Sequence, residues 1–224
     1  MNISDAIQAR KSVRAFLDRP VPRERIEAIL DTARWAPSGV NTQPWKVVVL
    51  AGQKKQELQQ RIITHFTTHG PGRMDFSYYP EQWQEPYVSR RRECGMALYG
   101  ALAIRRDDRE RRLQQWIANY RAFDAPVMLM FTMDRQLQTG SYMDYGMFLQ
   151  SVMLAALDHG LTTCPQAALG EFPDIVRDCL GLDEDQVIIS GMALGYEDTH
   201  APVNRYRTVR EPVEAFTTWM TGER

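Results

Sequence analysis

Hydrophobic residues follow two patterns along this chain, and each pattern predicts a type of element. In the first, they recur every three or four residues, which is the spacing of one helix face. After Pro22, for example, Ile26, Ile29 and Ala33 keep this spacing until Pro37 ends the pattern. The helices predicted in this way span residues 2–10, 22–36, 53–66, 88–105, 107–121, 142–159 and 174–180.

The second pattern is a continuous apolar run. Runs at residues 47–50, 127–131 and 187–194 predict buried strands. Strands that are apolar on both faces need cover on both faces, so we expect a mixed sheet with helices on both sides. The pattern leaves the fold class open between α+β and α/β. Residues 70–87 are rich in Pro, Gly and aromatic residues, and they predict a loop.

No internal repeat, low-complexity tract or Gly/Ser linker divides the chain. We therefore expect residues 1–224 to form a single domain, with a helical excursion near residues 70–125. The tail, residues 197–224, follows the last predicted strand but keeps apolar residues such as Phe216 and Trp219. We expect this tail to dock on a partner subunit.

Composition narrows the possible partners. The 27 Lys and Arg residues balance 28 Asp and Glu residues, so no basic field favours nucleic acid. The longest apolar run, 127–131, is far shorter than the ~20 residues that cross a membrane. The polar start is not typical of a secretory signal, and the three cysteines form no CxxC pair. We expect a cytoplasmic protein that binds neither nucleic acid nor a membrane.

Common catalytic motifs are missing from the sequence, which has no P-loop, GxGxxG, HExxH or GxSxG. No acid/base triad can be assembled, so we predict no catalytic side chain. His65 and His69 lie four residues apart, but no glutamate follows His65. An exposed helix end therefore explains them better than a metal, and we predict no metal site.

Two clusters stand out against this background. In Arg10-Lys11-Ser12-Val13-Arg14, three cations and a hydroxyl group follow a short helix, a composition that suits an anion. The alternative is a favourable interaction of these cations with the helix dipole. The second cluster, Ala36-Pro37-Ser38-Gly39-Val40-Asn41-Thr42-Gln43-Pro44-Trp45, is dense in amides and hydroxyls. Its alternative is an ordinary loop of turn residues.

At this spacing, the two clusters resemble the opening of the FMN-dependent nitroreductase family. Later segments agree with that resemblance. They are Gly160-Leu161-Thr162-Thr163-Cys164-Pro165-Gln166-Ala167, Ala193-Leu194-Gly195-Tyr196 and Arg210-Glu211-Pro212-Val213-Glu214. The middle of the chain, at 87–92 and 119–126, most resembles the branch that contains nitrobenzoate and nitroaromatic reductases.

The resemblance implies an α+β fold and a domain-exchanged homodimer with two FMN sites at the subunit interface. The FMN-binding residues that it implies are Arg10, Lys11, Ser12, Arg14, Pro37, Ser38, Gly39, Asn41, Gln43, Pro165, Gln166, Ala167, Ala168, Arg207 and Arg210.

The phosphate of FMN needs guanidinium and hydroxyl donors, which the resemblance assigns to Arg10, Ser12 and Arg210. The tail departs from the pattern of some relatives, which carry Lys where this chain has Thr208. Either Asn204 or Arg207 can compensate, and the sequence leaves that choice open.

The flavin ring has three implied neighbours. Arg14 fits the position near N1 and O2, where reduction leaves negative charge. The loop from Pro37 to Asn41 comes from the second subunit, with Gln43 nearby, although Gly39 stands where many relatives carry a second Ser. A backbone N–H of the turn from Pro165 to Ala168 faces N5.

The implied reaction passes electrons from NADH or NADPH through FMN to a nitroaromatic compound. The products are the nitroso compound and then the hydroxylamine, in a ping-pong scheme. Tyr87, Tyr120 and Phe123 are candidates to line the roof of the substrate pocket, with packing in the core as the alternative for each. Two other functions stay open: reduction of quinones, enones or flavins on the same scaffold, and storage or fragmentation of flavin without turnover.

Overall fold

A computed structural model describes residues 2–222 of the chain. The described residues contain seven α-helices, close to the positions that the periodicity predicts. They are α1 (Ile3–Ala9), α2 (Arg23–Ala33), α3 (Gly52–His69), α4 (Tyr87–Ala101), α5 (Arg109–Tyr120), α6 (Thr139–Asp158) and α7 (Pro173–Leu180). Short 3₁₀ turns add η1 (Gly39–Asn41), η2 (Ala122–Asp124), η3 (Ala167–Gly170), η4 (Pro202–Asn204) and η5 (Val213–Ala215).

Four strands form one sheet in the order β1-β2-β4-β3. They are β1 (Lys46–Ala51), β2 (Val127–Asp134), β3 (Thr162–Gln166) and β4 (Gln186–Gly195). β3 was not predicted, because its five residues include a proline and form no apolar run.

The prediction of a mixed sheet needs correction, because all three strand pairs are antiparallel. The parallel contact in the described residues is an isolated bridge between Ser12 and Thr163. A continuous apolar run reports burial on both faces and carries no information on strand direction.

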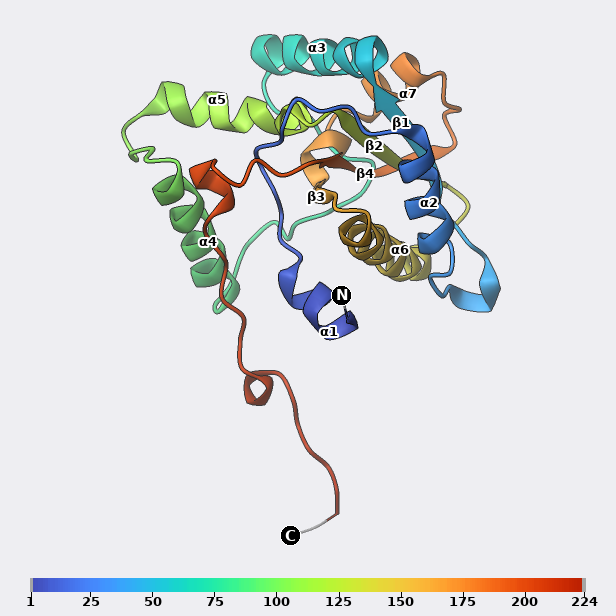
Figure 1. The fold of residues 1–224 in the computed structure, drawn as a ribbon, viewed down its shortest axis with the longest axis vertical. Helices are drawn as coiled ribbons and strands as arrows, with labels where there is room; N and C mark the ends of the chain where they lie inside the picture. Colours follow the sequence, from blue (N-terminus) through green and yellow to red (C-terminus); the bar gives the residue numbers. More distant parts are fainter. Residues whose placement is uncertain (1, 223–224) are drawn as a thin grey trace.

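Side chains of β2 alternate between two hydrophobic clusters, one on each face of the sheet. Leu129 and Phe131 pack in the cluster that also contains residues of α2 and α6. Met128 and Met130 pack in the other, with residues of α3, α5 and α7. Figure 1 shows α3 and α7 on one side of the sheet and α6 on the other. The prediction of an α+β fold with helices on both faces is confirmed.

Two parts of the chain lie outside this layered body. Helix α4 stands at the side of the molecule, and the C-terminal tail passes it and then leaves the body (Figure 1). The tail exposes Phe216 and Trp219, the latter to 76%. Its docking on a partner stays a prediction. None of the described helices combines the length and the apolar character needed to cross a membrane.

Candidate functional site

The cationic segment that follows α1 lies against the edge strand β3. The backbone N–H of Val13 donates to the carbonyl oxygen of Thr163 at 3.0 Å, and Ser12 forms the parallel bridge to the same residue. The side chain of Val13 is fully buried. This anchoring keeps the segment extended beside β3, so Arg10 and Arg14 are held at the edge of the sheet.

The tail crosses the same edge and closes a cavity of about 160 Å³. The cavity combines residues of the N-terminal segment, of α4 and of the tail. Its lining consists of Arg10, Lys11, Ser12, Arg14, Cys94, Tyr206, Arg207, Thr208 and Arg210.

Positive charge dominates this cavity. Lys11 pairs with Glu197 at 2.7 Å, but the cavity's four arginines have no carboxylate partner among the described residues. The pKa of Arg10 is lowered by burial first and then by the charges of Arg210 and Arg207. Crowded guanidinium groups without a counter-charge form a site for an anion such as phosphate. The donor set therefore fits the phosphate of FMN.

Two tail arginines are positioned by backbone carbonyl groups. Arg207 donates to the carbonyl oxygen of Ala9 at 2.8 Å and also to that of Gln8, at the C-terminal end of α1. Arg210 donates to Thr208 Oγ1 at 2.7 Å. These contacts orient the guanidinium groups and leave their charge uncompensated.

Asn204 holds the backbone of the cationic segment in place. Its Oδ1 accepts from the backbone N–H of Arg14 at 2.8 Å, and its Nδ2 donates to the carbonyl oxygens of Ala15 and Asp198. The residue is only 2% exposed. Both amide hydrogens are therefore used within the protein. Of the two residues left open by the sequence, Arg207 lines the cavity and Asn204 braces it.

Arg14 also lines this cavity. Its Nη1 donates to the hydroxyl oxygen of Tyr206 and to the carbonyl oxygen of Ser12, both at 3.2 Å. Its Cζ lies 5.8 Å from the centroid of the Phe123 ring. These three contacts restrict the guanidinium to one place beside β3.

The turn at the other end of β3 opens on a second cavity, of about 510 Å³. Pro165, Gln166, Ala167 and Ala168 all line it. Gln166 Nε2 donates to the carbonyl oxygen of Asn119 at 2.8 Å. The cationic segment contacts the start of β3, and the turn lies at its end. The length of this short strand therefore separates the predicted phosphate site from the predicted N5 site.

The loop from Pro37 to Gln43 lies elsewhere. The backbone N–H of Gly39 donates to Asp144 Oδ1 of α6 at 3.1 Å, and that of Gln43 donates to Ser38 Oγ at 3.0 Å. Figure 1 shows the segment between α2 and β1 at the opposite side of the molecule from α4. One chain therefore does not bring this loop to the cavity of arginines.

The backbone of this loop is unusual. Val40, Asn41 and Gln43 have φ angles of 45°, 57° and 48°. This left-handed region is rare for any residue other than glycine, and especially for the β-branched Val40. Val40 is also 98% exposed. Such conformations concentrate at functional sites, so the loop differs from an ordinary turn.

Two of the three roof candidates are buried within this chain. Tyr120 is fully buried at the end of α5, and Phe123 is buried in the same cluster. Both pack in the core, because the inner face of α5 and the left-handed turn at Phe123 direct them there. Tyr87 begins α4 and is exposed, so it stays a candidate.

Residues 7–196 match the sequence model of the Nitroreductase family. The chain belongs to this family. It is 41% identical over 222 residues to a 4-nitrobenzoate reductase of Pseudomonas putida, covering 98% of this chain and 96% of that protein. It is 39% identical over 219 residues to a chloronitrobenzene nitroreductase of Comamonas testosteroni, covering 97% and 96%. The predicted family is confirmed.

Solved structures of two nitroreductases share the fold over nearly the whole chain. The FMN and NADPH-dependent nitroreductase NfnB from Sphigopyxis sp. strain HMH has a TM-score of 0.95 at 40% identity, covering 98% of this chain and 99% of that one. The FMN-dependent NfnB from Mycobacterium smegmatis, in complex with NADPH, has a TM-score of 0.92 at 32% identity, covering 98% and 100%.

The sequence analysis does not identify a hydrogen-bonded group beside the turn from Pro165 to Ala168. Trp116 Nε1 donates to the hydroxyl oxygen of Tyr120 at 3.0 Å, and that hydroxyl donates to Glu171 Oε2 at 2.7 Å. Trp116 and Glu171 both line the second cavity. Burial raises the pKa of Glu171, although the hydrogen bond from Tyr120 opposes the shift. No motif marks these residues, because the group forms only when the end of α5 packs against Glu171, about 50 residues further along the chain.

Proposed function

We propose that this nitroreductase family member binds FMN and uses it to pass electrons from NADPH or NADH to nitroaromatic compounds. The observation that carries the proposal is the anion cavity of uncompensated arginines at the start of β3, with a second cavity at the end of the same strand. The relatives named as nitrobenzoate and chloronitrobenzene reductases support the acceptor class.

FMN would be held along β3 by this chain's own residues. Arg10, Ser12, Arg207 and Arg210, which line one cavity, would bind the phosphate, with Lys11 next to them. When bound, FMN supplies the redox chemistry, which accounts for a reductase without an acid/base triad.

Arg14 would lie near the part of the ring that becomes negative on reduction, and its charge would then favour the reduced state. The turn from Pro165 to Ala168 would supply a backbone N–H, from one of the residues after Pro165, to N5. Tyr87, exposed at the start of α4, would contact the substrate.

We further propose that the functional unit is a homodimer. Helix α6 buries Tyr145, Phe148 and Val152 on one side, yet Met143 is 73% exposed on the other. A helix that is apolar all round needs cover on both sides. A second copy would cover this face and the apolar tail, and would bring its Pro37 to Gln43 loop to the flavin ring.

We expect the nicotinamide and the nitro compound to use the same site in turn, with the redox chemistry between them supplied by bound FMN. Two electrons and two protons convert the nitro group to nitroso and water, and two more of each give the hydroxylamine. This is a ping-pong scheme.

Steady-state oxidation of NADPH and NADH by the yellow holoenzyme, against a panel of nitrobenzoates, nitrobenzenes and quinones, tests the function. We expect turnover with nitroaromatics, and parallel double-reciprocal lines when both substrates are varied. Faster turnover of quinones would indicate the alternative reductase activity, and flavin that stays oxidised under NADPH in the absence of air would contradict the proposal.

A further inference from the structure

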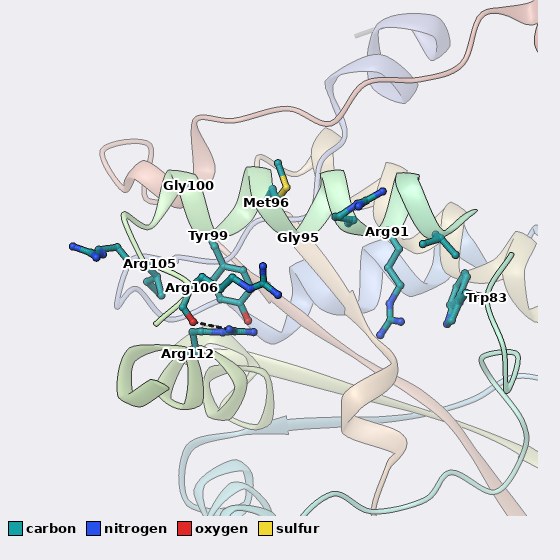
Figure 2. A pocket seen from close by; sticks show the side chains of 12 residues that line it. Trp83, Arg91, Gly95, Met96, Tyr99, Gly100, Arg105, Arg106 and Arg112 are labelled. Atoms are coloured by element: carbon teal, nitrogen blue, oxygen red, sulfur yellow. Dashed lines mark hydrogen bonds between the residues drawn. The ribbon is translucent and has the colours of Figure 1, made fainter. Parts of the chain in front are cut away.

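A second cationic cavity lies between α4 and α5, outside the proposed flavin site (Figure 2). Its volume is about 630 Å³, within the range of pockets that hold small molecules. Cys94 of α4 faces the anion cavity at the flavin site, whereas Gly95 and Tyr99 line this larger cavity. The two cavities therefore lie on different sides of α4.

Five arginines line this cavity, and no acidic side chain of the described residues does so. Arg105 pairs with Asp107 at 3.1 Å, and Figure 2 shows it pointing away from the other labelled side chains. The remaining four have no ion pair within the described residues. They are Arg91, Arg92, Arg106 and Arg112. Their charge exceeds what a single carboxylate balances, so it favours a ligand with one or more phosphate groups.

Aromatic rings hold two of these guanidinium groups. Arg91 Cζ lies 5.2 Å from a ring centroid of Trp83, and Arg112 Cζ lies 5.4 Å from the ring centroid of Tyr99. Figure 2 shows Arg91 and Tyr99 projecting from α4 towards α5. Rings and planar guanidinium groups together form a surface on which a flat base can stack.

Two glycines keep space open beside these groups. Gly95 and Gly100 lie within α4, where glycine is unfavourable for helix stability. A Cβ atom built on either one would meet no other atom within 4 Å. Packing of the chain does not require glycine at these positions, and both of them line the cavity.

We propose that this cavity binds a nucleoside phosphate, with its base on the apolar and aromatic surface and its phosphate groups on the arginines. This nucleoside phosphate has two possible sources: the adenosine 2′-phosphate end of NADPH, or a free nucleotide. The first source rests on the proposed function, whereas the binding site itself does not.

Equilibrium dialysis of 2′,5′-ADP and 5′-ADP against the FMN-loaded protein tests the site without turnover. Arg112→Gln should weaken binding by tenfold or more, and Gly95→Leu, which fills the open space, should abolish it. Arg109→Gln is the matched control, because Arg109 lies on the same helix outside the cavity and should leave binding unchanged. Circular dichroism and FMN content verify that each variant is folded.

Absence of nucleotide binding by the folded wild-type protein would overturn the proposal. Equal binding by Arg112→Gln and Arg109→Gln would also overturn it. Either result would leave the nitroreductase activity intact, so the two proposals fail separately.

Kinetics then identify the source of the nucleotide. If the ligand is NADPH, 2′,5′-ADP competes with NADPH, and Arg112→Gln raises the KM for NADPH several-fold more than the KM for NADH. If the ligand is a free nucleotide, 5′-ADP binds at least as tightly as 2′,5′-ADP and does not compete with NADPH. Both results support the site.

Discussion

The arginine cavity at β3 and the loop from Pro37 to Gln43 are two regions of one proposed site, and they differ in how far a single chain completes them. The cavity is built by three segments of the same chain, and hydrogen bonds from Asn204 and Arg207 join the tail to the N-terminal segment. The loop holds three residues at positive φ and exposes Val40 almost completely. The first region is organised within one chain, whereas the second contacts α6 at Asp144 and otherwise leaves most of its residues exposed. This difference supports the proposal that the loop belongs to the flavin site of a second copy.

The largest expected effect comes from breaking the contact that would join the two regions. Met143→Glu places a charge on the exposed side of α6, where the second copy would bury it. We expect a monomer that retains little FMN, measured by light scattering and flavin absorbance. Leu113→Glu is the control, since it changes a similarly apolar, exposed residue on α5 and should leave a flavin-loaded dimer. A Met143→Glu dimer with full flavin content would contradict the proposed interface.

The arginine cavity can be tested alone. Arg10→Ala removes a guanidinium that has no carboxylate partner, so FMN affinity should fall by about 1.5–3 kcal/mol, the scale of a charge-assisted hydrogen bond. Titration of apoprotein with FMN, followed by flavin fluorescence, measures this change. Arg109→Ala provides the matched control on a surface outside the cavity. Unchanged affinity in Arg10→Ala would remove the phosphate role.

Arg14 should affect the reduction potential of the flavin more than the affinity for FMN. At a separation of 4 Å and an effective dielectric constant of about 20, a positive charge attracts a negative one by about 4 kcal/mol, before solvation costs. Arg14→Gln should therefore make the two-electron potential more negative by tens of millivolts and slow reduction by NADPH. FMN binding should persist through Arg10 and Ser12. A spectroelectrochemical titration that gave equal midpoint potentials would leave Arg14 a structural role only.

The smallest effect concerns Glu171, next to the turn that follows β3. Burial raises its pKa in the folded state, so the folded protein binds this proton more tightly than the unfolded chain. The stability that it contributes is complete below the unfolded pKa and is lost as pH rises through the folded pKa. Glu171→Gln should flatten this loss, whereas the exposed Glu184→Gln should not. Urea unfolding between pH 4 and 8 checks this, and identical pH profiles for wild type and Glu171→Gln would contradict it.

Much of this fold was predictable from the hydrophobic pattern, and the exceptions have physical reasons. Helices such as α2 are predictable because one face is buried at helical spacing, and β2 because a continuous apolar run is buried on both faces of the sheet. β3 is not predictable from its composition, because its strand conformation depends on pairing with β4. In the same way, Tyr120 looks like any tyrosine near a loop until α3 and α7 are packed around it.

Residues of the candidate site are also predictable only where the local sequence carries a motif. The cationic segment and the Pro37 to Asn41 loop carry local motifs, so the resemblance could assign them. Tyr206 and Glu171 carry no motif, and their roles depend on contacts with residues far away in the sequence. Asn204 was visible as a candidate, but only its buried hydrogen bonds separate a brace from a phosphate ligand.

The central claim is that each flavin site takes the arginine cavity from one chain and the loop from another, and mixed dimers test it most directly. One chain carries Arg10→Ala. The other carries Ser38→Ala and Asn41→Gly, which remove two loop side chains without adding strain at the positive φ of Asn41. Each variant alone should form dimers that bind FMN weakly. In the mixed dimer, one site then combines an intact cavity with an intact loop, and titration should find one FMN bound per dimer with wild-type affinity. If cavity and loop served the same chain, every site of the mixed dimer would carry a defect, and absence of any wild-type site would contradict the account.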